Sequence, residues 1–413
     1  MRKRLFAILM AVALFVVAGP VEMVSAEDLT ISAKVSSKTT NSITLSWSYD
    51  GGSPEGDVTI KNGSKVVDTV DASKTSYKVT GLKADTSYTF TVSADGASDT
   101  VTASTEKIKI NGLKVMSGYK AVKVKWSKVE GAAKYDVKYS GKVRGKKKSG
   151  TKTVSTNACK ITGFKEFDVT NTKKSPVTDK DFTFKVTAKD SSGNVIATKT
   201  IKGFPVRTMY YKLTFKKSAS LTSHSGGKKT LNFRKGQTVY ARGFDGGRFI
   251  FDYKCPDGKI RTYYTMKIRV VPSIWKNHID PKTEYTEAEA EFYANGRGIN
   301  SKTKNMIWIN TYSQREYVFK GKKGKWNVIK GPWLVSTGKA SKPTATGSTN
   351  INRRSPSEHG IPNWNVTRHF SLHGKHSSWK LGWPKSGACV RNYNENAKWI
   401  YENTPLRTRV YVF

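Results

Sequence analysis

The C-terminal stretch of the chain holds the residues whose types and spacing best suit chemistry. Cys389 follows two small residues, Gly387 and Ala388, which leave room for a substrate backbone to approach the sulfur. A thiol becomes a thiolate near neutral pH only beside a base or a cation, and His373 lies upstream in the same segment. This pair predicts a cysteine nucleophile activated by a histidine. The alternative is that Cys389 is a small apolar residue filling a turn.

The other two cysteines have structural explanations. Cys159 occupies an alternating position of a predicted strand, and Cys255 continues an aromatic face in "RFIFDYKC". We expect both thiols to be buried and reduced, since a bond between them would have to bridge two domains. Cys389 is therefore the thiol that most needs a functional reason.

Other kinds of site have little support in the sequence. The histidines form no His-x-x-x-His pair on a predicted helix, and no paired Cys-x-x-Cys accompanies them, so we expect no metal. No glycine-rich loop follows a strand and opens a helix, so we expect no nucleotide and no other cofactor.

The surrounding motifs resemble the end of an L,D-transpeptidase catalytic domain. "FSLHGKHSSWKLGWPKSGACVRNYNENAKWIYENTPLRTRVYVF" has His-Gly on a strand, a loop, Ser-x-x-Cys-apolar-Arg, a short helix and a last strand. "VSTGKASKPTATGSTNI", at 335–351, resembles an earlier segment of that family. The pattern is broken in two places: Gly387-Ala388 replaces the usual His-Gly, and Asn392 replaces an apolar residue. Ala388 is tolerated there if its φ is negative, whereas a left-handed backbone would be strained.

The resemblance implies a role for each residue of the pair. Cys389 would be the nucleophile and His373 the base, with a backbone carbonyl at Gly374 holding the imidazole in the productive tautomer. The loop before the cysteine would supply the oxyanion hole and its support, through Ser386, Gly387 and Ala388.

Three further residues are candidates for substrate binding. Arg391 would contact a substrate carboxylate, or else brace the loop through an ion pair. His359 and Trp383 would line the cleft, although an aromatic residue near a strand end is more often part of a core.

The implied reaction is acyl transfer on peptidoglycan stem peptides through a thioester on Cys389, giving 3-3 cross-links. If water resolves the thioester, the protein is instead an L,D-carboxypeptidase. A cell-wall-binding or adhesive protein with a degenerate catalytic domain is the alternative from another class.

Short alternating strands dominate the elements that must position this site, so the predicted fold class is mainly β. "ITLSWS" and "YKVTGLKADTSYTFTVSA" recur in altered form as "VKVKWS", "CKITGFKEF" and "DFTFKVTA", and this repeat resembles tandem fibronectin type III sandwiches. A small SH3-like β-barrel and a C-terminal β-rich L,D-transpeptidase catalytic domain follow. Thr286 caps the one clear helix, Glu289 completes a capping box, and Asn295-Gly296 stops it.

Six segments result from this pattern. The predicted boundaries are 1–26 for a signal peptide, 27–105 and 106–205 for two fibronectin type III-like domains, 206–272 for the SH3-like domain, 273–303 for a connecting segment with the helix, and 304–413 for the catalytic domain.

The first residues and the charge predict the location. Met1–Arg4 is basic, Leu5–Gly19 is apolar and Val24-Ser25-Ala26 suits cleavage, which favours a secretory signal over a membrane anchor. No later segment reaches the roughly 20 apolar residues of a membrane span. Residues 27–105 hold ten acidic and seven basic side chains, so nearly all of the net charge of +41 lies beyond them. We expect a secreted, cell-wall-associated protein whose partners are stem peptides and anionic wall polymers and not nucleic acid. A basic surface kept for solubility is the alternative.

Overall fold

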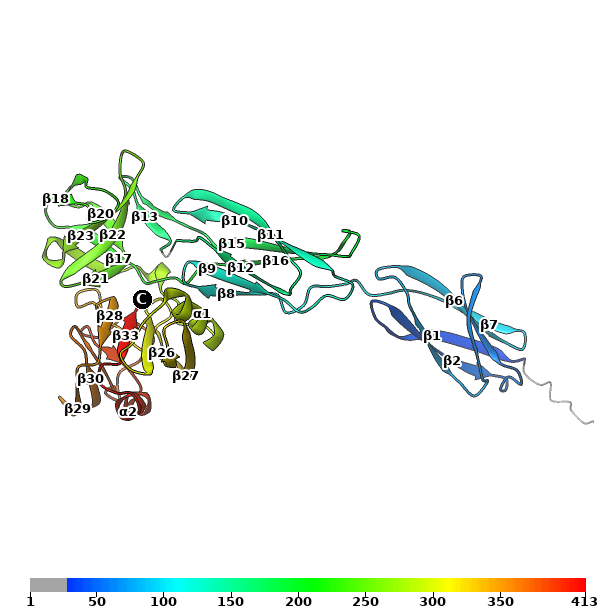
Figure 1. Cartoon of the computed structure of the whole chain (residues 1–413). Coiled ribbons are helices and arrows are strands. Elements are labelled where there is room, and N and C mark those ends of the chain that lie inside the picture. The colour runs from blue at the N-terminus through cyan, green and yellow to red at the C-terminus, as the bar shows by residue number, and fades with distance from the viewer. Residues whose placement is uncertain (1–27, 166) are drawn as a thin grey trace, which may run out of the picture. The chain divides into compact units, whose positions relative to one another are not determined.

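The computed structural model describes residues 28–165 and 167–413, and the predicted signal peptide lies outside this part of the chain. The chain divides into two compact units between Ile108 and Lys109, and each unit is described by itself. Both are built almost entirely from antiparallel strands, so the predicted mainly β fold class is confirmed (Figure 1).

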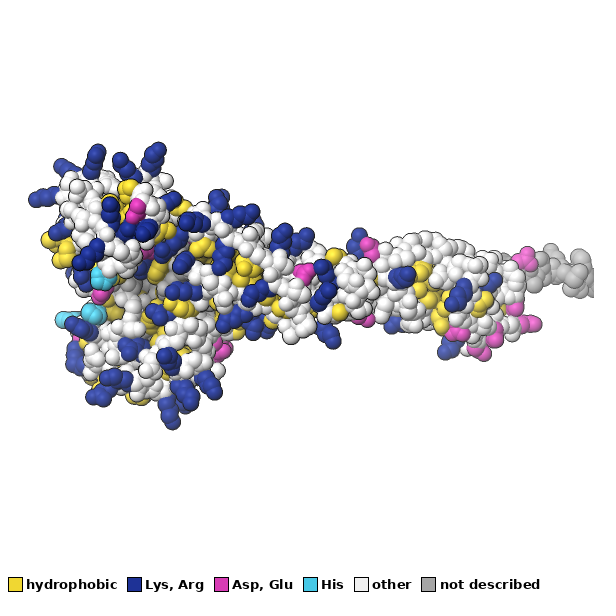
Figure 2. All heavy atoms as spheres, turned by 45° about the horizontal axis from the view of Figure 1, so that its top comes forward, with side chains coloured by type: hydrophobic (Ala, Val, Ile, Leu, Met, Phe, Trp, Pro, Cys, Tyr) yellow, Lys and Arg dark blue, Asp and Glu magenta, His cyan; other side chains and the backbone are white. Residues whose placement is uncertain are grey.

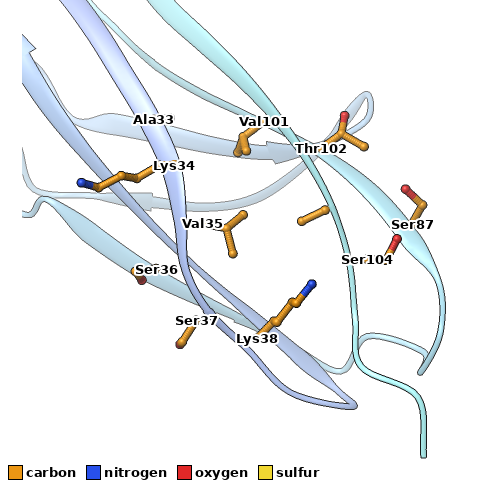
Figure 3. Close-up of a pocket in the computed structure, with 11 residues that line it drawn as sticks. Ala33, Lys34, Val35, Ser36, Ser37, Lys38, Ser87, Val101, Thr102 and Ser104 are labelled. Carbon is orange, nitrogen blue, oxygen red and sulfur yellow. The ribbon is translucent and has the colours of Figure 1, made fainter.

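The first unit is a sandwich of two sheets. Its strands are β1 (Thr30–Lys38), β2 (Ser42–Asp50), β3 (Val58–Asn62), β4 (Lys65–Val70), β5 (Ser76–Thr80), β6 (Ser87–Ala94) and β7 (Ala97–Ser104), in the orders β1-β2-β5 and β4-β3-β6-β7. Alternate residues of β2 face the core, and Trp47 is 4% exposed. A groove of about 750 Å³ lies between the edge strands β1 and β7 (Figure 3). The Asp99 carboxylate accepts the Ala33 N–H there at 2.7 Å and so links the two sheets.

A second sandwich opens the second unit. Its strands are β8 (Lys114–Gly118), β9 (Ala121–Lys125), β10 (Lys134–Val143), β11 (Lys146–Val154), β12 (Ala158–Thr162), β15 (Phe182–Lys189) and β16 (Val195–Gly203), in the orders β12-β9-β8 and β11-β10-β15-β16. Trp126 packs edge-on against Tyr135 with ring centroids 5.1 Å apart. Cys159 is paired with Val124 and is buried, as the alternating pattern predicted.

The insertion of the second sandwich joins the next domain. Its strands β13 (Val169–Asn171) and β14 (Pro176–Thr178) extend a sheet with β21 (Gly243–Asp245), β22 (Arg248–Lys254) and β23 (Ile260–Met266). The remaining strands are β17 (Tyr211–Phe215), β18 (Ala219–Thr222), β19 (Thr230–Phe233), β20 (Thr238–Ala241) and β24 (Val270–Ile274), with the 3-10 turns η1 (Lys267–Arg269) and η2 (Lys276–His278). Aromatic side chains fill the core of this third β domain, and Cys255 is buried among them.

Two sheets and two helices form the last part of the chain. One sheet has the order β27-β26-β25-β33-β28 and the other β29-β30-β31-β32. Their strands are β25 (Asn305–Asn310), β26 (Arg315–Lys322), β27 (Lys325–Leu334), β28 (Gly347–Asn350), β29 (Arg353–Glu358), β30 (Ile361–Val366), β31 (Ser371–His373), β32 (Val390–Arg391) and β33 (Arg409–Val412). Helix α1 (Glu287–Arg297) covers one face of the first sheet, and helix α2 (Asn394–Asn403) contacts β30 and β31. Apolar side chains of both sheets share one core.

The capping box of α1 is confirmed, but its predicted end is wrong. Thr286 accepts the N–H of Glu289, and the Glu289 carboxylate accepts the Thr286 N–H at 2.9 Å. The helix continues through Asn295-Gly296 and ends at Gly298, which has a φ of 68°. Asn295 stays helical because its side chain bonds the backbone of Trp326 in both directions, at 2.6 and 2.9 Å.

Among the described residues, no helix is long and apolar enough to cross a membrane.

Candidate active site

Two short parallel strands bring the predicted pair together. Leu372 of β31 pairs with Val390 of β32, and both side chains enter the core between the sheets. Successive side chains of a strand point to opposite faces. His373, and Cys389 immediately before β32, therefore lie on the other face. The register alone makes them diagonal neighbours, although the sequence separates them by a loop.

The imidazole of His373 is held in one tautomer. Its Nδ1–H donates to the Gly374 carbonyl at 2.5 Å, which leaves the Nε2 lone pair free to accept a proton. The side chain is 3% exposed, and its ring stacks on Trp364 with centroids 4.2 Å apart and planes 18° apart. Burial lowers the pKa of His373 to about 4, so the ring is neutral at pH 7 and is able to act as a base.

The thiol of Cys389 is protonated at rest. Burial raises its pKa above the ordinary value, while a backbone hydrogen bond from Ser371 and the nearby charge of Arg391 oppose that shift. The residue is partly exposed, unlike Cys159 and Cys255. A neutral thiol beside a neutral base suits proton transfer at the moment of attack.

The loop before the cysteine is fixed by hydrogen bonds to segment 335–346. Ser386 is fully buried, its hydroxyl donates to the Cys389 carbonyl, and its N–H donates to the Thr337 carbonyl at 3.0 Å. The Thr344 hydroxyl donates to the Ala388 carbonyl at 2.5 Å. These bonds hold the backbone around the sulfur in one conformation.

Arg391 faces the same side as His373. Its guanidinium lies 3.6 Å from the centre of the Trp379 ring, and its backbone bonds Ser336 in both directions at 3.0 Å. Within the described residues Arg391 forms no ion pair with an acidic side chain. The alternative role, bracing the loop through an ion pair, therefore has no support there. Stacking holds the guanidinium in place and leaves N–H groups for a carboxylate.

The other two candidates are both exposed. The ring of His359 lies edge-on to that of Trp364 with centroids 6.3 Å apart, and Trp364 in turn stacks on His373. Trp383 is 43% exposed and not part of a core. Among the described residues, no group of three or more His, Cys, Asp or Glu residues suits a metal ion.

This arrangement can be compared with known proteins. Residues 304–412 match the family model of the L,D-transpeptidase catalytic domain. Residues 30–109 match the fibronectin type III domain. Both resemblances seen in the sequence are thereby confirmed, and we call residues 304–412 the transpeptidase-like domain.

Solved structures give weaker similarities. The crystal structure of a fused Zn-dependent amidase/peptidase and peptidoglycan-binding protein from Clostridium acetobutylicum is 23% identical, with a TM-score of 0.27, over 31% of this chain and 59% of that one. An L,D-transpeptidase from Stackebrandtia nassauensis is 22% identical, with a TM-score of 0.26, over 29% and 59%. A two-domain fibronectin type III segment of chicken tenascin is 19% identical, with a TM-score of 0.25, over 43% and 100%. This chain thus spans about three fifths of the first two structures. No curated protein matches the sequence.

Two buried polar residues lie behind the pair in the transpeptidase-like domain. The first was not predicted from the sequence, and the second was noted there only as a departure from the family pattern. Glu316 of β26 and Asn392 are both fully buried. Neither carboxylate oxygen of Glu316 has a well-formed hydrogen bond. The side chain of Asn392 lies beside the carboxyl and partly opposes the rise in its pKa that burial causes. Burial raises the pKa of Glu316 to about 8. Asn392 also touches the site, because its N–H donates to the His373 carbonyl at 2.9 Å.

The backbone of Ala388 is left-handed, with a φ of 92°, so the condition set by the sequence is not met. Glycine adopts this φ freely, whereas a Cβ is strained there. Gly387, by contrast, does not have a positive φ, and a Cβ added to it would meet nothing closer than 4.0 Å. In this loop, the position that favours glycine is 388.

Ala388→Gly is therefore expected to stabilise the transpeptidase-like domain by about 1 kcal/mol, because release of the strain outweighs the added freedom of the unfolded chain. Thermal unfolding measures the effect. Gly387→Ala is the matched control, and its unfolding temperature should stay close to that of the native protein. An unchanged or lower unfolding temperature for Ala388→Gly would contradict the strain.

Proposed function

We propose that this protein is a cysteine L,D-transpeptidase that acts on peptidoglycan stem peptides. The observation that carries the proposal is the pairing of β31 with β32, which places a neutral imidazole of fixed tautomer beside a partly exposed thiol. The family match of residues 304–412 supports the same reaction class.

The proposed first step is acylation of Cys389. His373 Nε2 takes the thiol proton while the sulfur attacks the carbonyl of the diamino acid at stem position three. The bond to the terminal D-alanine breaks, and the imidazolium returns the proton to the departing amine. The products are free D-alanine and a thioester on Cys389.

The second step resolves the thioester. The side-chain amine of a neighbouring stem attacks the thioester carbonyl, gives its proton to His373, and forms a 3-3 cross-link as the thiol leaves. Water in place of the amine gives a tripeptide, which is L,D-carboxypeptidase chemistry. Both outcomes need the same thiol and the same base.

The loop before Cys389 is the proposed oxyanion hole. Its backbone N–H groups from Gly387 to Cys389 would face the developing negative charge, and the bonds made by Ser386 and Thr344 fix it before substrate arrives. Arg391 is the proposed partner of a substrate carboxylate, and His359 and Trp383 are proposed to contact the substrate. No cofactor is needed for either step.

The basic surface suits an insoluble polyanionic substrate. Lys and Arg side chains are spread over the face of the second unit that Figure 2 shows and far outnumber the acidic ones there. We propose a secreted, wall-associated protein whose preceding domains hold the transpeptidase-like domain against anionic wall polymers and raise its local concentration.

Incubation of the full chain with a disaccharide tetrapeptide tests the function. We expect the mass of one D-alanine to be lost from the substrate, with a cross-linked dimer if an amine resolves the thioester and a tripeptide alone if water does. A disaccharide tripeptide is the control, since it carries no D-alanine to expel and cannot form a dimer by itself. Unchanged tetrapeptide would overturn the proposal in favour of a wall-binding protein with an inactive catalytic domain.

A further inference from the structure

The turn η1 and the adjoining ends of β23 and β24 expose apolar side chains to solvent. Met266 is 42%, Ile268 76% and Val271 56% exposed. In the described part of the chain nine large apolar residues are exposed, and three of them lie within these six positions. Such clustering is unusual for a surface that meets only water.

Basic side chains surround these apolar residues. Lys267 and Arg269 alternate with them in the sequence. Arg248 lies opposite Met266 in the ladder of β22 and β23, and the N–H of Lys216 donates to the Arg269 carbonyl at 2.9 Å. Within the described residues, none of these four cations forms an ion pair with an acidic side chain. We call residues 266–271, together with Arg248 and Lys216, the basic apolar tip.

The backbone of the tip is held firmly. The Lys267 N–H donates to the Gly247 carbonyl at 2.9 Å, and Val270 pairs with Phe215 and is 1% exposed. Val270 therefore anchors the segment in the core of the third β domain while its neighbours face outward. The apolar side chains are presented by a fixed scaffold and not by a loose loop.

We infer that the basic apolar tip binds the surface of an anionic lipid bilayer. Cations beside exposed apolar side chains match a bilayer interface, where lipid headgroups meet the cations and the acyl region takes up the apolar groups. A soluble polyanion would attract the cations but give no environment for Ile268. A second copy of the tip would bring like charges together, so it is a poor occupant. This inference does not depend on the proposed function.

Sedimentation of the full chain with lipid vesicles tests the inference. We expect binding to vesicles of phosphatidylglycerol and phosphatidylcholine, and at least tenfold weaker binding to phosphatidylcholine alone. Ile268→Ser should weaken binding to the anionic vesicles about tenfold. Val195→Ser removes an apolar side chain that is 60% exposed on β16 and should bind as the native protein does.

A charge variant tests the second half of the inference. Lys267→Gln should weaken vesicle binding about fivefold, and adding salt should reduce that difference. Thermal unfolding confirms that the variants are folded. If Ile268→Ser binds anionic vesicles as tightly as the native protein does, the inference is wrong, and charge alone attracts the protein to polyanions. Soluble polyphosphate is the control for attraction by charge alone, since Ile268→Ser should leave the binding of the protein to polyphosphate unchanged.

Discussion

Replacement of Cys389 by alanine is expected to reduce acyl transfer from the tetrapeptide by at least about four orders of magnitude, because no other group at the site can form the thioester. Mass spectrometry of the intact protein should show an acyl adduct on the native chain and none on Cys389→Ala. Cys159→Ala is the matched control, since that thiol is buried in the second sandwich. It should retain full activity and the adduct.

The effects of replacing Cys389 and His373 on the rate should not be additive. His373→Ala is expected to lower the rate about 10²-fold to 10⁴-fold, because the thiol then has no base and its pKa is raised by burial. The double variant should be no slower than Cys389→Ala, since residues that act in one step are not additive. If His373→Ala keeps the native rate, or if the two losses multiply, the assignment of His373 as base is wrong.

Local signals in the sequence were sufficient for the elements and for the pair. Alternating strands, the capping box at Thr286 and the repeated tryptophans each depend on neighbours a few residues away, and the structure places Trp47 and Trp126 in their cores. The family resemblance placed the His-Gly motif on a strand, and the structure has β31 ending at His373.

Long-range contacts account for what the sequence did not predict. The end of α1 depends on hydrogen bonds between Asn295 and Trp326, and those bonds outweigh a stop signal that has no tertiary partner. Trp364 was missed because its stacking on His373 crosses two strands of a sheet whose register is not readable from the sequence. An aromatic residue in a short strand gave no sign of that contact.

The backbone conformation at Ala388 could not be predicted from the sequence either. The sequence identified Ala388 as the position at which the sign of φ matters, but the sign itself depends on hydrogen bonds from Thr344 and on the path of segment 335–346. The burial of Glu316 could not be predicted either, because a lone glutamate in an alternating strand is usually exposed. Only the packing of the two sheets buries it beside Asn392.

Glu316→Gln is expected to stabilise the protein more strongly as pH rises. In the unfolded chain the Glu316 carboxyl titrates near its ordinary pKa of 4.5, whereas in the folded protein burial raises its pKa to about 8. The folded state therefore keeps a proton that the unfolded state releases between these values, so native stability falls as pH rises from 4.5 to 8. Glutamine does not titrate and avoids this loss. The variant should gain about 1 kcal/mol at pH 5 and on the order of 4 kcal/mol at pH 8.

Denaturant unfolding followed by tryptophan fluorescence at pH 5 and pH 8 measures this gain, since Trp308 and Trp326 are fully buried in the same domain. Glu402→Gln is the control for removal of a surface carboxyl, because the Glu402 side chain is 54% exposed. A gain for Glu316→Gln that is equal at both pH values would show that Glu316 is not protonated in the folded state.

Replacement of Asn392, which lies beside Glu316, is expected to lower the stability of the protein. Asn392→Leu removes the polar side chain beside the carboxyl and should destabilise the protein by about 1–3 kcal/mol, because a buried polar group loses its neighbour. Replacing both residues by leucine removes the buried polar groups together, so the double variant should recover that loss and be most stable relative to native at pH 8. Recovery in the double variant would show that Glu316 and Asn392 act as a pair, whereas two independent losses would show that they do not.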